Sequence, residues 1–355
     1  MPVTKLSISA VACVCLPLLS AGAQGQVVYD LPKLIKSSDV VAVARVEAVG
    51  QTGSGTVNLP GDHSIPSLFR VAFLRLTDVL KGAPASADIA VRYMILYSQG
   101  GWSGGVPPGY TIRDTLTLNS VRLIFLKSVG DHYEFTNGSY LSVVCGPEAP
   151  SRAEPANALD RVLSLINEAL LSTSVSQEEK AEAIRQLGAV KTDSVVPALR
   201  TFVQGEVARN DEILRVEALV ALLGHNEESV LEAAEAELLS GSIPYWKSNL
   251  LLAITRAIGP SRSIPILAKV LASSSAQMRT SAAVAIYQTN SGAGVTPLLT
   301  ALDDPDPEVG FAVMQGLGNL TRNYAWRPKS TEQDADWFRC LSHWREYRQR
   351  LNHDE

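Results

Sequence analysis

From about residue 177 onward a short unit repeats, and this periodicity constrains the fold more than any other feature of the chain. An Ala- and Leu-rich stretch ending at or near a glycine recurs at residues 182–188, 217–224, 252–259 and 312–318, with a variant lacking the glycine at 282–287. The stretch that follows often opens with a proline, at Pro197, Pro265 and Pro297. Glycine suits the end of a helix and proline its first turn. The unit is therefore a pair of helices of about 34 residues.

The repeats predict an all-α solenoid over residues 177–325. We expect helical pairs at 177–205, 211–240, 245–272 and 275–303, and an unfinished pair from 305. One such hairpin cannot bury its apolar stripe, whereas stacked hairpins share a continuous core. Residues 326–355 stop repeating and predict a final helix over 336–351, in which Trp337 and Trp344 cover the open end of the stack.

The turn Asp303–Val309 and the helix starts at Leu214-Arg215 and Met278-Arg279 resemble HEAT-like repeats of the short kind. The last unit departs from that pattern, because Gly310 stands where arginine is expected. Ankyrin repeats are the competing interpretation, since Thr296-Pro297-Leu298-Leu299 nearly matches their helix start. That match occurs once and is not echoed in neighbouring units, so we favour the HEAT-like interpretation.

Residues 24–149 have a different composition and predict a small all-β domain, an OB-like barrel or a sandwich. A short helix is expected at 30–38 and a strand from Val40. Further strands are expected at 69–80, 89–96, 121–126, 133–135 and 140–145. The breaks between strands are expected at 50–67, 82–86 and 98–109. Pro-rich residues open a linker and lead-in helix over 150–176.

The order Ser38-Asp39-Val40-Val41, Val79-Leu80-Lys81-Gly82 and Leu123-Ile124-Phe125-Leu126 resembles a β-domain of exported bacterial proteins. That domain is distantly similar to the barrel of tissue metalloproteinase inhibitors. Those inhibitors chelate the metal of their target through an N-terminal cysteine. The expected mature N-terminus here is near Gln24, so the resemblance does not carry that mechanism over.

The first 23 residues predict a secretory signal peptide. Lys5 precedes an apolar run from Leu6 to Leu19, and Ala21-Gly22-Ala23 offers small residues for cleavage. We therefore expect a periplasmic or extracellular protein, and no later stretch is apolar for long enough to predict a membrane span. Cys145 and Cys340 remain after cleavage. They pair only if the fold brings their Cα atoms within about 7 Å, and we favour two buried thiols.

Motifs that carry chemistry lack the context they need. Gly101–Gly105 matches the G-x-S-x-G pattern, but Val106-Pro107-Pro108-Gly109 follows where that motif needs a helix. The five histidines show no metal-ligand spacing. The acids Asp303, Asp304, Asp306 and Glu308 lack the order of a calcium loop and suit a helix N-terminus. We predict no catalytic residue, metal or cofactor.

The expected function is non-enzymatic binding or scaffolding of a protein or peptide on the solenoid surface. A net charge of −5 argues against a nucleic-acid partner. The candidate contact residues are Trp102, Tyr110, Arg200, Gln204 and Lys269, the last three on helix faces expected, with Glu235, to line the concave side.

Two alternatives stay open. One is a protease-inhibitor-like role for the β-domain. The other is an enzyme, since some short-HEAT proteins resemble bilin lyases or hydroxylases. Those hydroxylases need His-Glu pairs on repeat helices, and His225-Asn226-Glu227 is the nearest match, at a turn.

Overall fold

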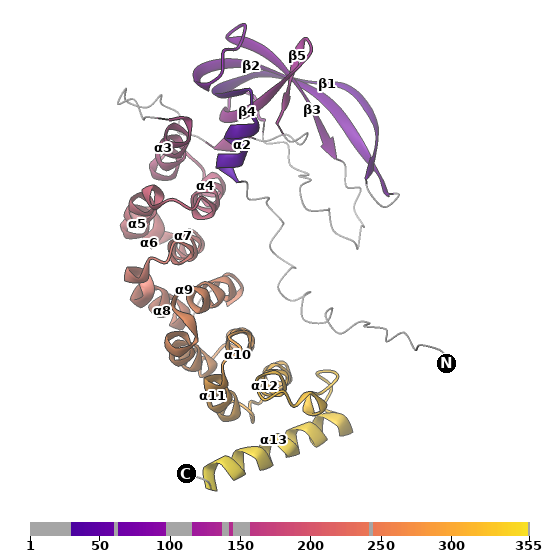
Figure 1. Cartoon of the computed structure of the whole chain (residues 1–355), viewed down its shortest axis with the longest axis vertical. Coiled ribbons are helices and arrows are strands. Elements are labelled where there is room, and N and C mark those ends of the chain that lie inside the picture. The colour runs from indigo at the N-terminus through magenta and orange to yellow at the C-terminus, as the bar shows by residue number, and fades with distance from the viewer. Residues whose placement is uncertain are drawn as a thin grey trace, which may run out of the picture. The chain divides into compact units, whose positions relative to one another are not determined.

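The computed structural model describes residues 30–59, 63–96, 116–136, 142–144, 157–240 and 244–353 (Figure 1). The predicted signal peptide, the G-x-S-x-G segment, Trp102, Tyr110 and Cys145 lie outside these residues. The chain divides into two compact units, Met1–Val162 and Leu163–Glu355. The first is a β-domain and the second is helical, as the sequence predicts.

Six strands build the β-domain: β1 (Val40–Leu59), β2 (His63–Lys81), β3 (Asp88–Leu96), β4 (Val121–Val129), β5 (His132–Phe135) and β6 (Ser142–Val144). The strand β1 pairs with β2 and β2 with β3, both antiparallel, and β3 pairs with β5 in parallel. The strand β4 then pairs with β5 and also with β1. This last pairing closes five strands into a barrel of the expected OB-like type, and β6 is added alongside β4.

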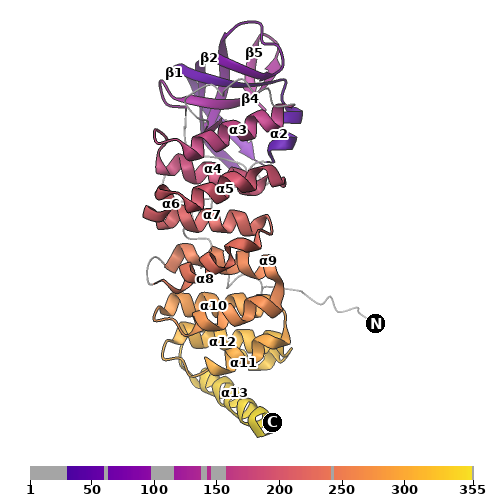
Figure 2. The same cartoon turned by 90° about the vertical axis from the view of Figure 1, so that its left-hand side faces the viewer.

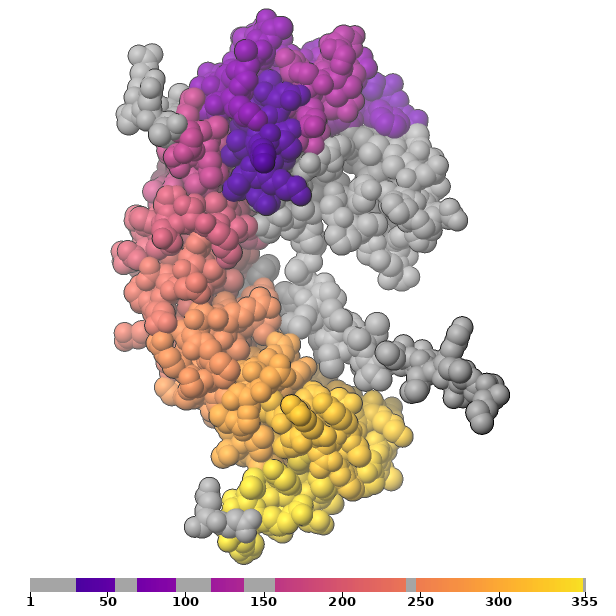
Figure 3. Space-filling model, viewed as in Figure 1, coloured from indigo at the N-terminus to yellow at the C-terminus, as the bar shows by residue number. Residues whose placement is uncertain are grey.

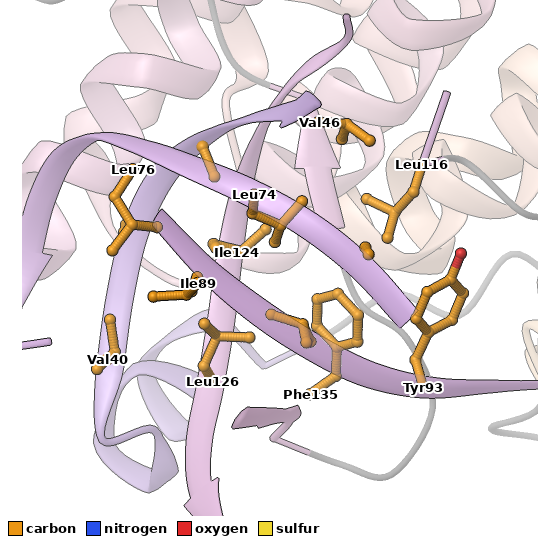
Figure 4. Packing of buried hydrophobic residues seen from close by; sticks show 14 residues of the cluster. Val40, Val46, Leu74, Leu76, Ile89, Tyr93, Leu116, Ile124, Leu126 and Phe135 are labelled. Atoms are coloured by element: carbon orange, nitrogen blue, oxygen red, sulfur yellow. The ribbon is translucent and has the colours of Figure 1, made fainter. Parts of the chain in front are cut away.

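The barrel core follows the two-residue period of its strands. Alternate residues such as Val40, Ala42, Ala44 and Val46 of β1 point inward and are buried. They meet buried residues of the other strands, including Leu74, Leu76, Ile89, Ile124 and Leu126 (Figure 4). Tyr93 and Phe135 pack edge to face, with ring centroids 5.9 Å apart.

The helix α2 (Leu31–Ser37) is attached to the barrel by the residues that carry the family resemblance. The Nζ of Lys81 donates to the carbonyl oxygens of Ile35 (2.7 Å) and Ser38 (2.6 Å), at the C-terminal end of the helix. The Asp39 carboxylate accepts from the Ser128 amide at 2.9 Å. Gly82 has φ +86°, and a Cβ there would collide with the Asp39 carbonyl. These residues therefore hold α2 against the barrel.

The predicted break at residues 50–67 is wrong. Most of it is strand: β1 extends to Leu59 and β2 begins at His63, with Gly55 paired to Ser67 and Leu59 to His63. The Gly- and Ser-rich composition signalled a loop, but a backbone ladder needs no apolar side chain, only matched N–H and C=O groups. Register shifts at Val46/Ala48 and Gln51/Gly53 mark bulges within the hairpin.

The helical unit contains the predicted helix pairs. The helix α3 (Ala158–Leu171) spans the boundary between the two units and lies in the expected lead-in segment. The helices that follow are α4 (Gln177–Ala189), α5 (Val196–Gln204), α6 (Glu206–Asn210), α7 (Glu212–Gly224), α8 (Leu231–Leu239), α9 (Pro244–Leu271), α10 (Ala276–Gln288), α11 (Val295–Thr300) and α12 (Pro307–Leu320), and then the final helix α13 (Ala335–His353).

The stretch named α9 is two helices. Gly259 has φ 71° and ψ 173°, which ends the first helix and lets Pro260 begin the second. By length and composition, Lys247–Leu271 would pass as a membrane-crossing helix, with a mean hydropathy of 1.2. Each half of α9 is shorter than the roughly 20 helical residues that a span requires. The apolar character of α9 instead reflects its place within the stack, where Leu250, Leu251 and Ile254 are buried.

The helical unit has two layers. The first helix of each pair (α4, α7, the first half of α9, α10 and α12) lies on the inner side of the curve of this unit (Figure 1). The second helices (α5, α8, the second half of α9 and α11) lie on its outer side and face the viewer in Figure 2. On the face drawn in Figure 3, successive pairs pack into one continuous surface.

Candidate functional site

A cation recurs at the fourth residue of the first helices: Lys180 in α4, Arg215 in α7, Lys247 in α9 and Arg279 in α10. Arg215 and Arg279 make the same contacts. The Nη1 of each donates to two carbonyls of the preceding turn, those of Ala208 and Arg209 for Arg215 and those of Ser273 and Ser274 for Arg279. Arg215 and Arg279 therefore each close the turn that leads into their helix.

Each arginine also binds a carboxylate near the end of the second helix of its pair. The Nε of Arg215 lies 2.6 Å from Glu237, and Arg279 makes a two-pronged contact with Asp304 at 2.6 and 2.9 Å. These hydrogen bonds raise the pKa of both arginines. The arginines that carry the repeat resemblance are thus internal ties and offer no free charge to a ligand.

Lys247 is the most deeply buried of these cations. Its Nζ lies 2.9 Å from Glu212 and 3.5 Å from Glu237, and it donates to the carbonyl and hydroxyl oxygens of Ser240. Only 1% of its side chain is exposed. This network could not be predicted from the sequence, because a lysine at a helix start is ordinarily solvated.

The last repeat has Gly310 in place of the cation, and the structure supplies the reason. A Cβ at this position would lie 3.0 Å from the ring of Trp337 in α13. Trp337 and Trp344 are buried, as expected for the residues that cover the open end of the stack. The tryptophan ring of the cap therefore occupies space that the periodic side chain fills elsewhere.

The described candidate contact residues are tied into the outer layer. Arg200 of α5 pairs with Glu227, and Lys269 pairs with Glu235 of α8. The carbonyl of Gln204 accepts two hydrogen bonds from Arg209, at 3.1 and 2.7 Å. They lie on second helices, so the expected concave placement is wrong (Figure 1). Lys269 and Glu235 are 34 residues apart, about one repeat, so their pair joins neighbouring units. Arg200 and Glu227 are 27 residues apart and also join neighbouring units.

The inner face presents a different surface. Val220 of α7, Leu252 of α9 and Val284 of α10 are partly exposed and hold the same place, five residues after the periodic cation. Each lies near the centre of a strip of exposed or partly exposed residues at helical spacing. In α10 this strip includes Gln277, Ser281, Val284 and Gln288. Sequence reasoning missed this row, although aligning the repeats on their cations would have shown it.

Polar residues flank the aliphatic row. Glu217, Asn249 and Ser281 lie on its N-terminal side along the helices, and Arg256 and Gln288 lie on its C-terminal side. The Arg185 guanidinium binds Glu217 at 2.8 Å across α4 and α7, and the hydroxyls of Ser248 and Ser281 are 2.9 Å apart across α9 and α10. Burial raises the pKa of Glu217, although Arg185 opposes that shift.

Aromatic side chains gather at the C-terminal end. The ring of Trp326 is stacked on His343 at 4.0 Å and has the Arg339 guanidinium 4.7 Å from its centroid. The indole N–H of Trp344 donates to the Trp326 carbonyl at 2.8 Å. These neighbours already occupy Trp326, so the cluster is a cap and not a stacking platform.

The remaining predicted residues have structural roles. Asp306 caps α12 by accepting from the amides of Glu308 and Val309, which confirms the predicted role of a helix-capping acid. Asp303 binds Arg345 and Arg348. His225 is hydrogen-bonded to the Leu187 carbonyl. Cys340 is buried. Within the described ranges, His, Cys, Asp and Glu form no cluster that could hold a metal ion.

The β-barrel exposes two aromatic side chains on β2. Phe69 and Phe73 are 42% and 50% exposed, against values of at most 1% for the inward-facing Ala72 and Leu74. Phe73 lies between Ala48 of β1 and Ala90 of β3, so small neighbours leave its ring uncovered.

Comparison with models of known protein families gives no match. Comparison with curated proteins gives none either. The class of protein therefore follows from the fold and the surfaces described above, a closed β-barrel joined to a helical repeat unit with an open inner face.

Proposed function

We propose that this chain is an exported, non-enzymatic binding protein whose HEAT-like helical unit holds a protein or peptide partner on its inner face. The observation that carries the proposal is the contrast between the two layers. Charged side chains of the outer layer are tied between repeats, as in Arg200–Glu227, Arg262–Glu228 and Lys269–Glu235. The inner face keeps a row of partly exposed aliphatic side chains in the same place on consecutive helices.

The end of the stack supports this interpretation. The helix α13 buries Trp337, Cys340 and Trp344 toward the repeats and exposes Arg345, Glu346 and Gln349. A largely polar outer face is typical of the end of a repeat array, although Phe338 is also exposed on α13. The side of the array is the larger surface that successive repeats share.

Affinity capture from the native exported fraction tests the proposal. The bait is the mature chain, compared with Leu252→Asn on the inner face and Ala233→Asn on the exposed face of α8 as a matched control. We expect the same captured protein with wild type and with Ala233→Asn, and its loss with Leu252→Asn. Equal capture by all three baits would refute inner-face binding.

A second candidate function involves the β-barrel. The exposed Phe69 and Phe73 favour a contact surface there, and the resemblance to metalloproteinase inhibitors makes a peptidase the candidate partner. Inhibition of exported peptidases by the wild-type chain, abolished by Phe73→Ser, would support this role. Absence of inhibition across serine, cysteine and metallopeptidases would reject it.

A further inference from the structure

We infer that the partner segment is a polyproline II helix with an aliphatic side chain at every third residue and a carboxylate beside the middle one. This inference rests on the proposed function and deepens it by naming the class of segment that the inner face takes.

The aliphatic row sets the spacing. Val220, Leu252 and Val284 occur once on each of three consecutive first helices, and all three are partly exposed. These helices pack directly on one another, α7 on α9 and α9 on α10. Packed helices have axes about 8–10 Å apart. A segment that crosses them therefore meets one aliphatic side chain about every 8–10 Å.

Of the regular conformations, polyproline II returns successive same-face side chains closest to that interval. Polyproline II has three residues per turn and a rise of 3.1 Å, so its side chains return to the same face about every 9.3 Å. A β-strand returns every second residue, after about 6.6–6.8 Å. An α-helix returns after one turn of about 5.4 Å. The period of the row therefore selects polyproline II.

The flanks of the row suit the backbone of such a segment. Polyproline II makes no internal hydrogen bonds, so its amide and carbonyl groups need outside partners. Asn249 and Gln288 are exposed on opposite flanks, and a primary amide both donates and accepts. These two side chains can therefore replace the water lost when the segment binds.

The position of the carboxylate on the partner segment follows from the charge of Arg256. Arg256 is exposed one turn after Leu252, and none of the ion pairs formed by the described arginines of the helical unit includes it. Arg185, which holds the place of Val220 on the preceding helix, is already bound to Glu217. Gln315 holds that place on α12. Polar residues thus end the aliphatic row on both sides. The partner segment therefore makes three aliphatic contacts, and with one contact at every third residue it is about seven residues long.

The test measures binding of two fluorescent peptides of identical composition to the mature chain by anisotropy. One has leucine at every third position (Leu-Pro-Ser-Leu-Glu-Pro-Leu), and the other has it at every second position (Leu-Pro-Leu-Ser-Leu-Glu-Pro). We expect the first to bind at least tenfold more tightly. Equal affinities, or no binding of either peptide at 1 mM, would overturn the inference.

A charge exchange tests the carboxylate. We expect Arg256→Glu to weaken binding of the first peptide about tenfold, and replacement of the peptide glutamate by lysine to restore it. Arg262→Glu, on the outer layer, should leave binding unchanged. If the exchange fails to restore binding, the assigned carboxylate contact is wrong. If a native partner is still lost with Leu252→Asn while peptide spacing has no effect, the proposed function stands and the polyproline II assignment falls.

Discussion

The buried cations show how single residues hold successive repeats together. Lys247 bridges Glu212 of α7 and Glu237 of α8, and Arg215 binds Glu237 from the other side. Two cations and two carboxylates thus share one site with little water around them. Such a network is costly to break by removing one member, because the partner charges stay buried without compensation.

Replacing this lysine should therefore destabilise the helical unit. We expect Lys247→Met to lower the free energy of unfolding by about 3 kcal/mol or more, since the carboxylates lose their shared cation. Arg262→Met is the matched control, because both side chains of its pair with Glu228 are about half exposed (54% and 49%). Its effect should stay below about 1 kcal/mol. Urea unfolding measures the free energy of unfolding of both variants. Equal losses of stability in Lys247→Met and Arg262→Met would contradict the buried network.

Gly294 offers a second test at this scale. It holds the place that Val195 and Val230 occupy in earlier repeats, at the end of a short 3₁₀ turn. A Cβ there would lie 2.6 Å from Ile286 and 2.9 Å from Leu320. Restoring the repeat with Gly294→Val should therefore cost about 2 kcal/mol through overpacking. Gly292→Ala in the same turn meets no atom within 4 Å and should be neutral. Thermal unfolding measures both variants. Equal destabilisation by Gly294→Val and Gly292→Ala would indicate a backbone effect, whereas loss with Gly294→Val alone would indicate overpacking.

At the scale of elements, the glycine inside α9 decides whether a long apolar segment is one helix or two. The φ and ψ of Gly259 (71° and 173°) lie in a region that is essentially restricted to glycine. No atom lies within 4 Å of a Cβ built there. Any cost of a substitution is therefore a cost of backbone conformation alone.

We expect Gly259→Ala to lower the free energy of unfolding by about 1–3 kcal/mol. Gly224→Ala, at the end of α7 and equally uncrowded, should be neutral or slightly stabilising. Chemical denaturation checks both variants. A stabilising Gly259→Ala would mean that α9 is a single continuous helix and not two helices separated at Gly259.

The cap helix α13 should respond to pH through His343. Burial lowers the pKa of this imidazole, and the nearby Arg350 and Arg339 add to the effect while Glu346 opposes it. The folded cap therefore favours the neutral ring, and the unfolded state takes up a proton first as pH falls below about 6.5. Stability from this contact is present above that pH and is lost below it.

Amide hydrogen exchange of α13 measures the effect. We expect its opening free energy to fall between pH 7.5 and 5.5 in wild type and to change less in His343→Gln. An equal change in both proteins would show that His343 does not control the cap.

Most helix pairs and their boundaries could be predicted from the sequence. The helix pairs repeat, and Pro197, Pro297 and Gly224 mark helix starts and ends by local chemistry. The sequence left a barrel and a sandwich open, because the pairing of β1 with β4 that decides between them joins residues about 80 apart, such as Ala42 and Ile124. The inner face could not be distinguished from the outer layer, because the partners of exposed charges such as Arg200 become visible only when the repeats are stacked.

At the scale of the whole molecule, scaffold residues and surface residues are separate. The barrel residues that carry the resemblance hold α2 in place, and the periodic arginines tie the turns of the repeats. Among the described residues outside these ties are the aliphatic row of the helical unit, with Arg256 beside it, and the two exposed phenylalanines of the barrel. Partner binding is therefore expected where side chains have no structural task.

Site-specific photo-crosslinking in the native exported environment tests this most directly. A photoreactive side chain is placed at Asn249 on the inner face or at Thr201 on the outer layer, both of which are exposed. The account predicts a discrete crosslinked partner from position 249 and none from position 201. A crosslink from 201 alone, or from neither position, would contradict it.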